Sequence, residues 1–241
     1  MQTNKKRKFS ITKRERVSDL TEIGLYEYIM FGAVLLAAIV GMFQMFRKKV
    51  PMYFMLYICG VWCFAIRLIY IGLIDLCGEV YNEASSLGFL GIGGMFAFFA
   101  SANYGTFNSL IDDRGKKIHL IRTVAALNAV FVIGLIAFEM MYADTLTPFN
   151  IITLVISLFP VPFCVYFCTK LLLMKSNGDN LLIGVKPLNL STLLICFGIL
   201  LYNYFNITGN QLGMDITFGI YSICIVAEVF LADWGRKKWQ S

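Results

Sequence analysis

The sequence predicts an all-α membrane protein, a bundle of seven transmembrane helices joined by short loops. Seven apolar segments are each about as long as the roughly 20 residues that a helix needs to cross a bilayer. Hydrophobic residues make up 58% of the chain and charged residues only 15%, whereas soluble domains carry about a quarter charged residues. Basic residues also gather in alternate gaps between the apolar segments, a pattern typical of a chain that keeps its basic loops cytoplasmic.

The apolar segments and the polar ends define the expected domain organisation. We expect one transmembrane domain over residues 21–234, preceded by a basic polar N-terminal tail (1–20) and followed by a short basic cytoplasmic tail (235–241). The gaps are short and rich in turn formers, so consecutive helices should be antiparallel neighbours. The predicted helices cover residues 23–46, 52–76, 87–111, 121–142, 149–174, 188–206 and 214–234.

The distribution of lysine and arginine predicts the orientation. The gaps at residues 76–86, 143–150 and 207–213 contain neither residue type. We assign the other side of the bundle, together with the C-terminus, to the cytoplasm. The basic residues on that side are Arg47, Lys48, Lys49, Arg114, Lys116, Lys117, Arg122, Lys170, Lys175, Lys186, Arg236, Lys237 and Lys238.

Seven crossings then place the N-terminus outside, although residues 1–20 carry seven basic residues that resist translocation. Two arrangements remain open. In the first, the tail crosses the membrane because the basic residues of the downstream loops determine the orientation. In the second, the segment 23–46 does not fully span the membrane and the tail stays inside. We favour the first arrangement because this segment is long, very apolar and free of proline.

Composition also limits the expected partners and location. The net charge of +6 lies in short loop clusters and tails, with no polar domain to present it, so we expect no nucleic-acid binding. Attraction to anionic lipid headgroups explains these charges better. We expect an integral protein of the plasma (inner) membrane that contacts membrane lipids and a small-molecule ligand. A signalling or assembly partner protein is an additional expectation, because a sensor without an output domain must pass its signal on.

Residues that bind metals or cofactors do not form a recognisable set. Six of the seven cysteines lie within apolar segments, where cysteine behaves as a small apolar residue. The single histidine, His119, follows a basic loop. The sequence therefore predicts no metal, no cofactor and no catalytic residues, which argues against an enzyme without excluding one.

Small residues recur along one face of the third segment. Gly93, Ala97, Ser101 and Gly105 are spaced four apart, which predicts close packing of helix backbones. Asn103 and Tyr104 follow on the inner half of the same segment. A tightly packed central helix that carries such polar groups is also a natural place for a ligand.

Arg67 is the clearest polar residue at membrane depth, in the outer half of the second segment. A charge there costs roughly 2.5–3.5 kcal/mol on insertion scales, so it needs a partner or a wet cavity. Acidic candidates on the same side are Glu27, Glu139 and Asp215, and Asn203 lies at a similar depth. One interpretation is a structural ion pair or a snorkelling arginine. The other is an outward-opening pocket in which the guanidinium binds an anionic group.

A second polar set is expected in the inner half, with Asn103, Asn108, Asn128 and Glu228. Glu228 is deep enough to need hydrogen bonds or protonation. Such residues suit a ligand pathway, but polar side chains between membrane helices also hold helices together.

The leading hypothesis is a transporter or receptor-like sensor that binds a small, anionic molecule inside the bundle. Arg67 would anchor the anion, and Glu139 or Glu27 would balance its charge. Asn103, Tyr104, Asn203 and Glu228 complete the expected ligand-binding residues. The alternatives are a non-catalytic scaffold or assembly subunit and, less favoured, a membrane enzyme that modifies lipids.

Overall fold

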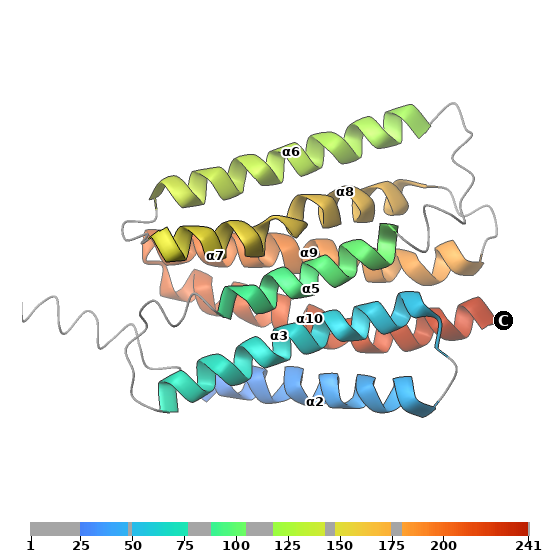
Figure 1. The fold of residues 1–241 in the computed structure, drawn as a ribbon, viewed down its shortest axis with the longest axis horizontal. Coiled ribbons are helices and arrows are strands. Elements are labelled where there is room, and N and C mark those ends of the chain that lie inside the picture. Colours follow the sequence, from blue (N-terminus) through green and yellow to red (C-terminus); the bar gives the residue numbers. More distant parts are fainter. Residues whose placement is uncertain are drawn as a thin grey trace, which may run out of the picture.

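The computed structural model describes residues 25–47, 50–76, 88–104, 118–142, 148–174 and 180–240, and its regular structure within these ranges is entirely helical. The helices, labelled as in Figure 1, are α2 (Leu25–Arg47), α3 (Met52–Leu76), α5 (Gly88–Ala102), α6 (Ile118–Tyr142), α7 (Pro148–Leu158), α8 (Pro160–Leu173), α9 (Asn180–Thr208) and α10 (Gln211–Gln240).

The chain runs back and forth along the long axis of the bundle (Figure 1). We call the end that carries the C-terminus the inner end and the opposite end the outer end, after the predicted orientation. Helices α2, α5 and α8 end at the inner end, where α3, α6 and α9 begin, and helices α3, α6 and α9 end at the outer end, where α5, α7 and α10 begin. The helix ends that flank the basic gaps of the sequence therefore share one end of the bundle, as the threading pattern predicted.

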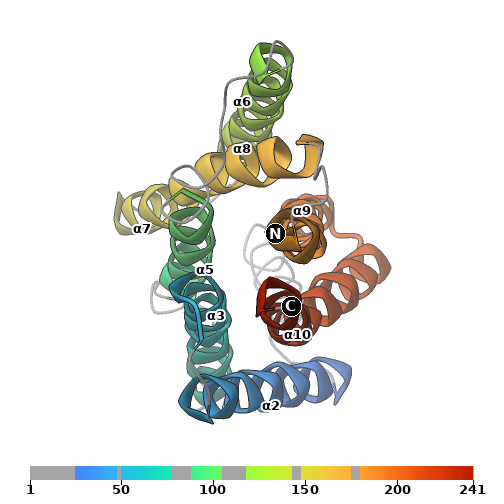
Figure 2. The same ribbon diagram turned by 90° about the vertical axis from the view of Figure 1, so that its right-hand side faces the viewer.

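Six spans, one of which lies mostly in α8 and begins in α7, are long and apolar enough to cross a membrane. The seventh crossing is α5, which has 15 residues and is about 22 Å long at 1.5 Å per residue. That is shorter than a hydrocarbon core of about 30 Å. Because α5 packs against α3, α7 and α8 (Figure 2), neighbouring helices surround it. The all-α membrane bundle predicted from composition is confirmed.

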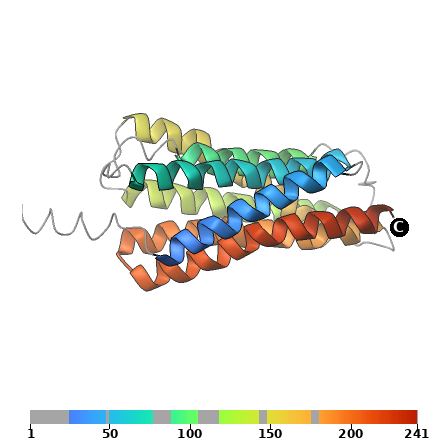
Figure 3. The same cartoon turned by 90° about the horizontal axis from the view of Figure 1, so that it is seen from below.

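Six crossings enclose the interior, and one helix lies outside. Viewed along the axis, α2, α3, α5, α8, α9 and α10 follow one another around the bundle, while α6 rests on α8 (Figure 2). Helix α2 crosses the bundle obliquely, near α10 at its outer end and beside α3 at its inner end (Figure 3). The interior is rich in aromatic rings, such as the stacked pair Tyr57 and Phe99, whose centroids are 4.7 Å apart.

Several helix boundaries differ from the sequence prediction. Helix α9 begins at Asn180 rather than at 188 and continues through Pro187, which membrane helices tolerate because neighbours can satisfy the freed backbone groups. Helix α10 continues to Gln240 instead of ending at 234. The fifth segment is broken at Phe159, between α7 and α8, because Pro160 and Pro162 lack the backbone N–H that would continue the ladder.

Glycines on α5 provide close contacts, but in a different pattern from the predicted stripe. A Cβ on Gly93 would lie 2.6 Å from the Cα of Ser157, and one on Gly91 would lie 2.7 Å from the carbonyl oxygen of Cys63. Of the stripe itself, Ser101 is exposed and position 105 lies outside the described residues. The glycines at 91 and 93 therefore hold α5 against α3 and α7 respectively, and Ser101 does not extend this packing.

Candidate functional site

Arg67 lies in the outer half of α3, as predicted, and its side chain is partly buried. Helix α5 passes so close that a Cβ on Gly91 would stand 2.6 Å from the Arg67 Cβ. The guanidinium carbon lies 5.3 Å from the centre of the Phe64 ring, within the range of a cation–π interaction. Its Nε is buried and has no hydrogen-bond partner among the described residues.

Two tyrosines connect Arg67 to acidic residues on other helices. The guanidinium interacts with the hydroxyl of Tyr221 on α10. Tyr202 on α9 interacts electrostatically with Arg67, Glu27 and Asp215 together. The rings of Tyr202 and Tyr221 meet edge to face, with centroids 6.1 Å apart. We call Arg67, Tyr202, Tyr221, Glu27 and Asp215 the outer cluster.

The structure associates two of the three acidic candidates with Arg67. Glu27 in the first turn of α2 belongs to the outer cluster. Asp215 does as well, and it accepts a 3.0 Å hydrogen bond from Gln211. The Glu139 side chain lies outside the described part of the structure, and its helix α6 packs against α8 and α9. Asn203 is half-buried on α9, next to Tyr202.

The inner half of the bundle contains a second set of polar side chains, centred on Asn103 at the end of α5. The Asn103 Oδ1 accepts a 3.2 Å hydrogen bond from Tyr53. Its Nδ2 donates to the hydroxyl of Tyr57 at 3.0 Å and to the sulfur of Cys168 at 3.4 Å. Asn103 thus joins α3, α5 and α8, and its predicted role in an inner polar layer has a structural counterpart.

Helix α9 extends this set toward Glu228. The hydroxyl of Tyr57 donates to Oδ1 of Asn189 at 3.3 Å, and Asn189 is fully buried. Thr192 lies three residues further along α9, on the same side of the helix. Its hydroxyl donates to Oε1 of Glu228 at 2.9 Å. We call Tyr53, Tyr57, Asn103, Asn189, Thr192 and Glu228 the inner cluster.

Glu228 is the only carboxyl in this cluster. Its side chain on α10 is 0% exposed. Oε1 accepts the hydrogen bond from Thr192, and the Ser191 hydroxyl, which donates to the carbonyl oxygen of Cys224, also interacts with the carboxyl. By hydrogen-bond geometry, Oε2 is buried without a partner among the described residues. A carboxyl held in this way offers one free acceptor, or one donor when protonated.

Two further predicted polar residues lie apart from the inner cluster. Tyr104 is 59% exposed, and its ring contacts that of Phe167, with centroids 5.5 Å apart. Asn128 on α6 donates a 2.9 Å hydrogen bond to Thr169 on α8. Tyr104 and Asn128 therefore both contribute to helix contacts around α8. The remaining predicted residue of this set, at position 108, lies outside the described residues.

Several members of the two clusters were not identified from the sequence. Asn189 falls at the start of the predicted helix 188–206, whereas α9 begins eight residues before 188, at Asn180. Tyr57, Tyr202 and Tyr221 carry no sequence signal that separates them from other tyrosines. The spacing of Asn189 and Thr192 on one helix face is the single pattern that points to such a site.

The chemistry available in the two clusters is hydrogen bonding and charge pairing. Within the described residues, no three histidine, cysteine or acidic side chains lie together as a metal site would require. The outer cluster contains a guanidinium and two phenol hydroxyls, which suit a carboxylate or phosphate. It also contains the carboxyls of Glu27 and Asp215, which compete with an anion for the guanidinium. Comparisons with protein-family models, curated proteins and solved structures found no match to this chain.

Proposed function

We propose that this polytopic membrane protein binds a small anionic molecule inside its helix bundle, as a transporter or a receptor-like sensor. The observation that carries the proposal is the partly buried Arg67, whose Nε has no hydrogen-bond partner among the described residues. A guanidinium presents its donors in a planar fork that matches carboxylate and phosphate oxygens. An anion with two such oxygens would satisfy Nε and an adjacent terminal nitrogen together.

The surroundings of Arg67 support reversible binding of the anion rather than permanent binding. Glu27 and Asp215 lie within electrostatic range of the same tyrosine as Arg67. Because either carboxylate can neutralise the guanidinium when the site is empty, release of the ligand need not expose an uncompensated arginine charge in the bilayer. The inner cluster, with Asn103 and Glu228, would form a second polar layer on the route toward the inner end.

A scaffold role is the second candidate, and the inner cluster is the observation that favours it. The amide of Asn103 bonds Tyr53, Tyr57 and Cys168. Polar contacts of this kind between helices hold a bundle together without any ligand. On this hypothesis the outer cluster would also serve only to fix α2, α3, α9 and α10 relative to one another.

Thermal unfolding in detergent tests the proposal with a panel of inorganic phosphate and small mono- and dicarboxylates. An anion at a hundred times its Kd should stabilise the protein by about 2.7 kcal/mol. Arg67→Gln should abolish that stabilisation. Lys238→Gln is the control because Lys238 is an exposed cation on α10 that belongs to neither cluster, and this variant should keep the full effect.

Two outcomes would overturn the proposal. One is that no anion in the panel stabilises the wild-type protein, and the other is that Arg67→Gln responds as the wild type does. If an anion passes this test, its uptake into proteoliposomes separates the two remaining roles. Accumulation indicates a transporter, and binding without flux indicates a sensor.

A further inference from the structure

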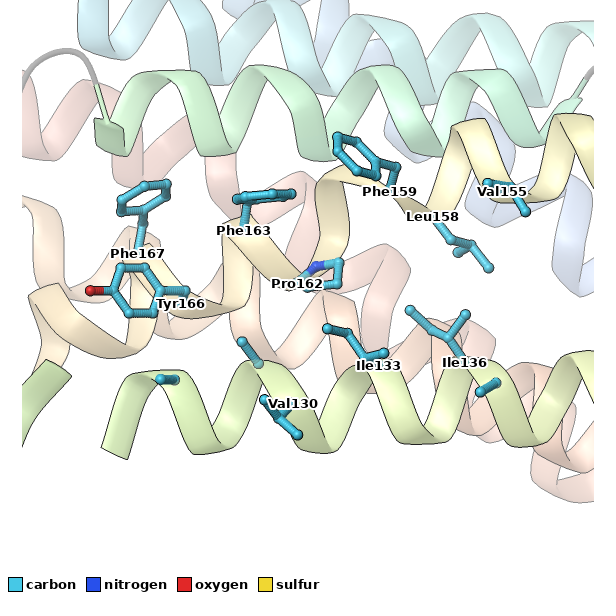
Figure 4. Close-up of a pocket in the computed structure, with 13 residues that line it drawn as sticks. Val130, Ile133, Ile136, Val155, Leu158, Phe159, Pro162, Phe163, Tyr166 and Phe167 are labelled. Carbon is cyan, nitrogen blue, oxygen red and sulfur yellow. The ribbon is translucent and has the colours of Figure 1, made fainter. Parts of the chain in front are cut away.

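An apolar groove runs along the outside of the bundle, between α6 and the broken helix formed by α7 and α8 (Figure 4). Its volume is about 780 Å³, within the range of about 300–1,000 Å³ found for ligand sites. The α6 side of its wall extends from Ala126 to Ala137, and the opposite side from Val155 to Phe167. None of the predicted ligand-binding residues lines it.

The break in the fifth crossing shapes this groove. Helix α7 ends at Leu158 and α8 begins at Pro160, and both Phe159 and Pro162 belong to the groove wall. Helix α6 packs mainly against α8, with a smaller contact to α9, and it is the least buried of the membrane spans (Figure 2). The two sides of the groove are therefore held apart at the kink instead of packing side chain to side chain.

The lining of the groove selects an apolar occupant. Every lining residue is apolar except for one hydroxyl, that of Tyr166. Tyr166 lies toward the inner end of the groove, with its oxygen directed away from the apolar wall (Figure 4). Tyrosine commonly occupies this position in membrane proteins, with its ring in the apolar layer and its hydroxyl at headgroup level.

The groove lies across the middle of the α6 span. Its α6 wall runs from Ala126 to Ala137, about 17 Å at 1.5 Å per residue, within the span Ile118–Phe138. One leaflet of the hydrocarbon core is about 15 Å thick, half of about 30 Å. An acyl chain whose headgroup lies at the inner end therefore fills the groove only if it extends past the middle of the bilayer.

Positive charge stands at the inner end of the groove. Arg122 is exposed and lies four residues before Ala126, so it is one turn nearer the inner end on the same helix face. The next basic residues along the sequence, Lys116 and Lys117, precede α6 directly. A cation at this depth attracts an anionic headgroup, with a contribution of about 1 kcal/mol per Lys or Arg.

We propose that this groove binds one acyl chain of an anionic phospholipid from the inner-end leaflet, with the phosphate of its headgroup at Arg122. The chain lies between α6 and the α7–α8 kink, and the lipid bridges the peripheral helix to the rest of the bundle. This site is separate from the Arg67 site and does not depend on it.

Native mass spectrometry after exchange into mixed phosphatidylglycerol and phosphatidylcholine tests the site. The wild type should retain one phosphatidylglycerol in preference to phosphatidylcholine. Arg122→Gln should reduce that preference about fivefold, the equivalent of about 1 kcal/mol. Ala126→Phe places a ring at the inner end of the groove, where the acyl chain enters, and should abolish retention of either lipid. Leu127→Phe is the matched control because Leu127 is 64% exposed and does not line the groove.

Unfolding temperature measured on each variant separates loss of the lipid from loss of the fold. Arg122→Gln should remain folded, because it changes only an exposed side chain. Equal retention of the two lipids, or an unchanged preference in Arg122→Gln, would overturn the headgroup contact. Retention in Ala126→Phe equal to that in Leu127→Phe would overturn the acyl-chain site. A dimer that Ala126→Phe dissociates would show instead that a second copy of the chain covers this face.

Discussion

Thr192 on α9 and Glu228 on α10 form a buried hydrogen bond that the threonine hydroxyl must share with its own helix. The Thr192 Oγ1 lies 2.9 Å from Oε1 of Glu228 and 2.9 Å from the carbonyl oxygen of Leu188. A hydroxyl has one proton, so Thr192 can donate to only one of these acceptors at a time. A protonated Glu228 resolves the conflict, because the carboxyl then donates to Thr192 while Thr192 donates to Leu188.

Glu228→Gln should therefore leave the fold intact. The amide is neutral, nearly isosteric, and able to donate to Thr192, so we expect a loss of less than about 1.5 kcal/mol. Glu228→Lys places an amine with no acidic partner at a site that is 0% exposed and should prevent folding. The direct measurement is the infrared band of a protonated carboxyl at neutral pH, which should disappear in Glu228→Gln. Persistence of the same band in that variant would contradict a neutral Glu228.

The Tyr57 hydroxyl should contribute more to stability than a hydroxyl with one hydrogen bond, because it bonds the side-chain amides of both Asn103 and Asn189. Tyr57→Phe removes the acceptor for Asn103 Nδ2 and the donor for Asn189 Oδ1. Leaving buried polar groups unsatisfied costs about 1–3 kcal/mol each. Because Asn103 Nδ2 keeps its bond to the Cys168 sulfur, one group loses its partner, and unfolding in detergent should show a loss of about 1–3 kcal/mol. Tyr104→Phe, at a residue that is 59% exposed, should show almost none. Equal effects of the two substitutions would contradict the inner cluster.

The crossing of α9 and α10 near the inner end should tolerate no side chain. A Cβ on Gly235 would lie 2.7 Å from the carbonyl oxygen of Gly184 and 2.9 Å from the Phe54 ring. Gly235→Ala should therefore destabilise the bundle by about 1–3 kcal/mol through overpacking. Gly134→Ala is the matched control, since a Cβ there meets nothing within 4 Å and alanine favours the helix. A Gly235→Ala variant as stable as Gly134→Ala would contradict this crossing.

The sequence was sufficient to predict the bundle because bilayer crossing imposes a length and a polarity on each helix. It was less informative about helix ends. Pro187 marks a boundary in soluble helices, yet α9 passes through it. The basic residues after Trp234 suggested a tail, yet α10 continues to Gln240. Both cases reflect one cause, since helices in membranes extend beyond the apolar layer and accept proline where neighbours satisfy the backbone.

The candidate site could be predicted only in part. Arg67 and Glu228 stand out because a charge within an apolar segment is rare and costly. Their neighbours could not be identified, because tyrosines and small polar residues are common in membrane helices and the sequence does not state which helices touch. Glu139 illustrates this limit. From the sequence it is as suitable as Glu27, but its side chain lies outside the described part of the structure, so its pairing with Arg67 stays a prediction.

A structure determined in lipid nanodiscs with the anion that most stabilises the protein would show whether Arg67 binds a ligand. We expect non-lipid density between α3, α9 and α10, with two of its oxygens within hydrogen-bond distance of the Arg67 guanidinium. A dry interior in which the Arg67 Nε bonds the carboxylate of Glu27 or Asp215, unchanged by the anion, would contradict this expectation.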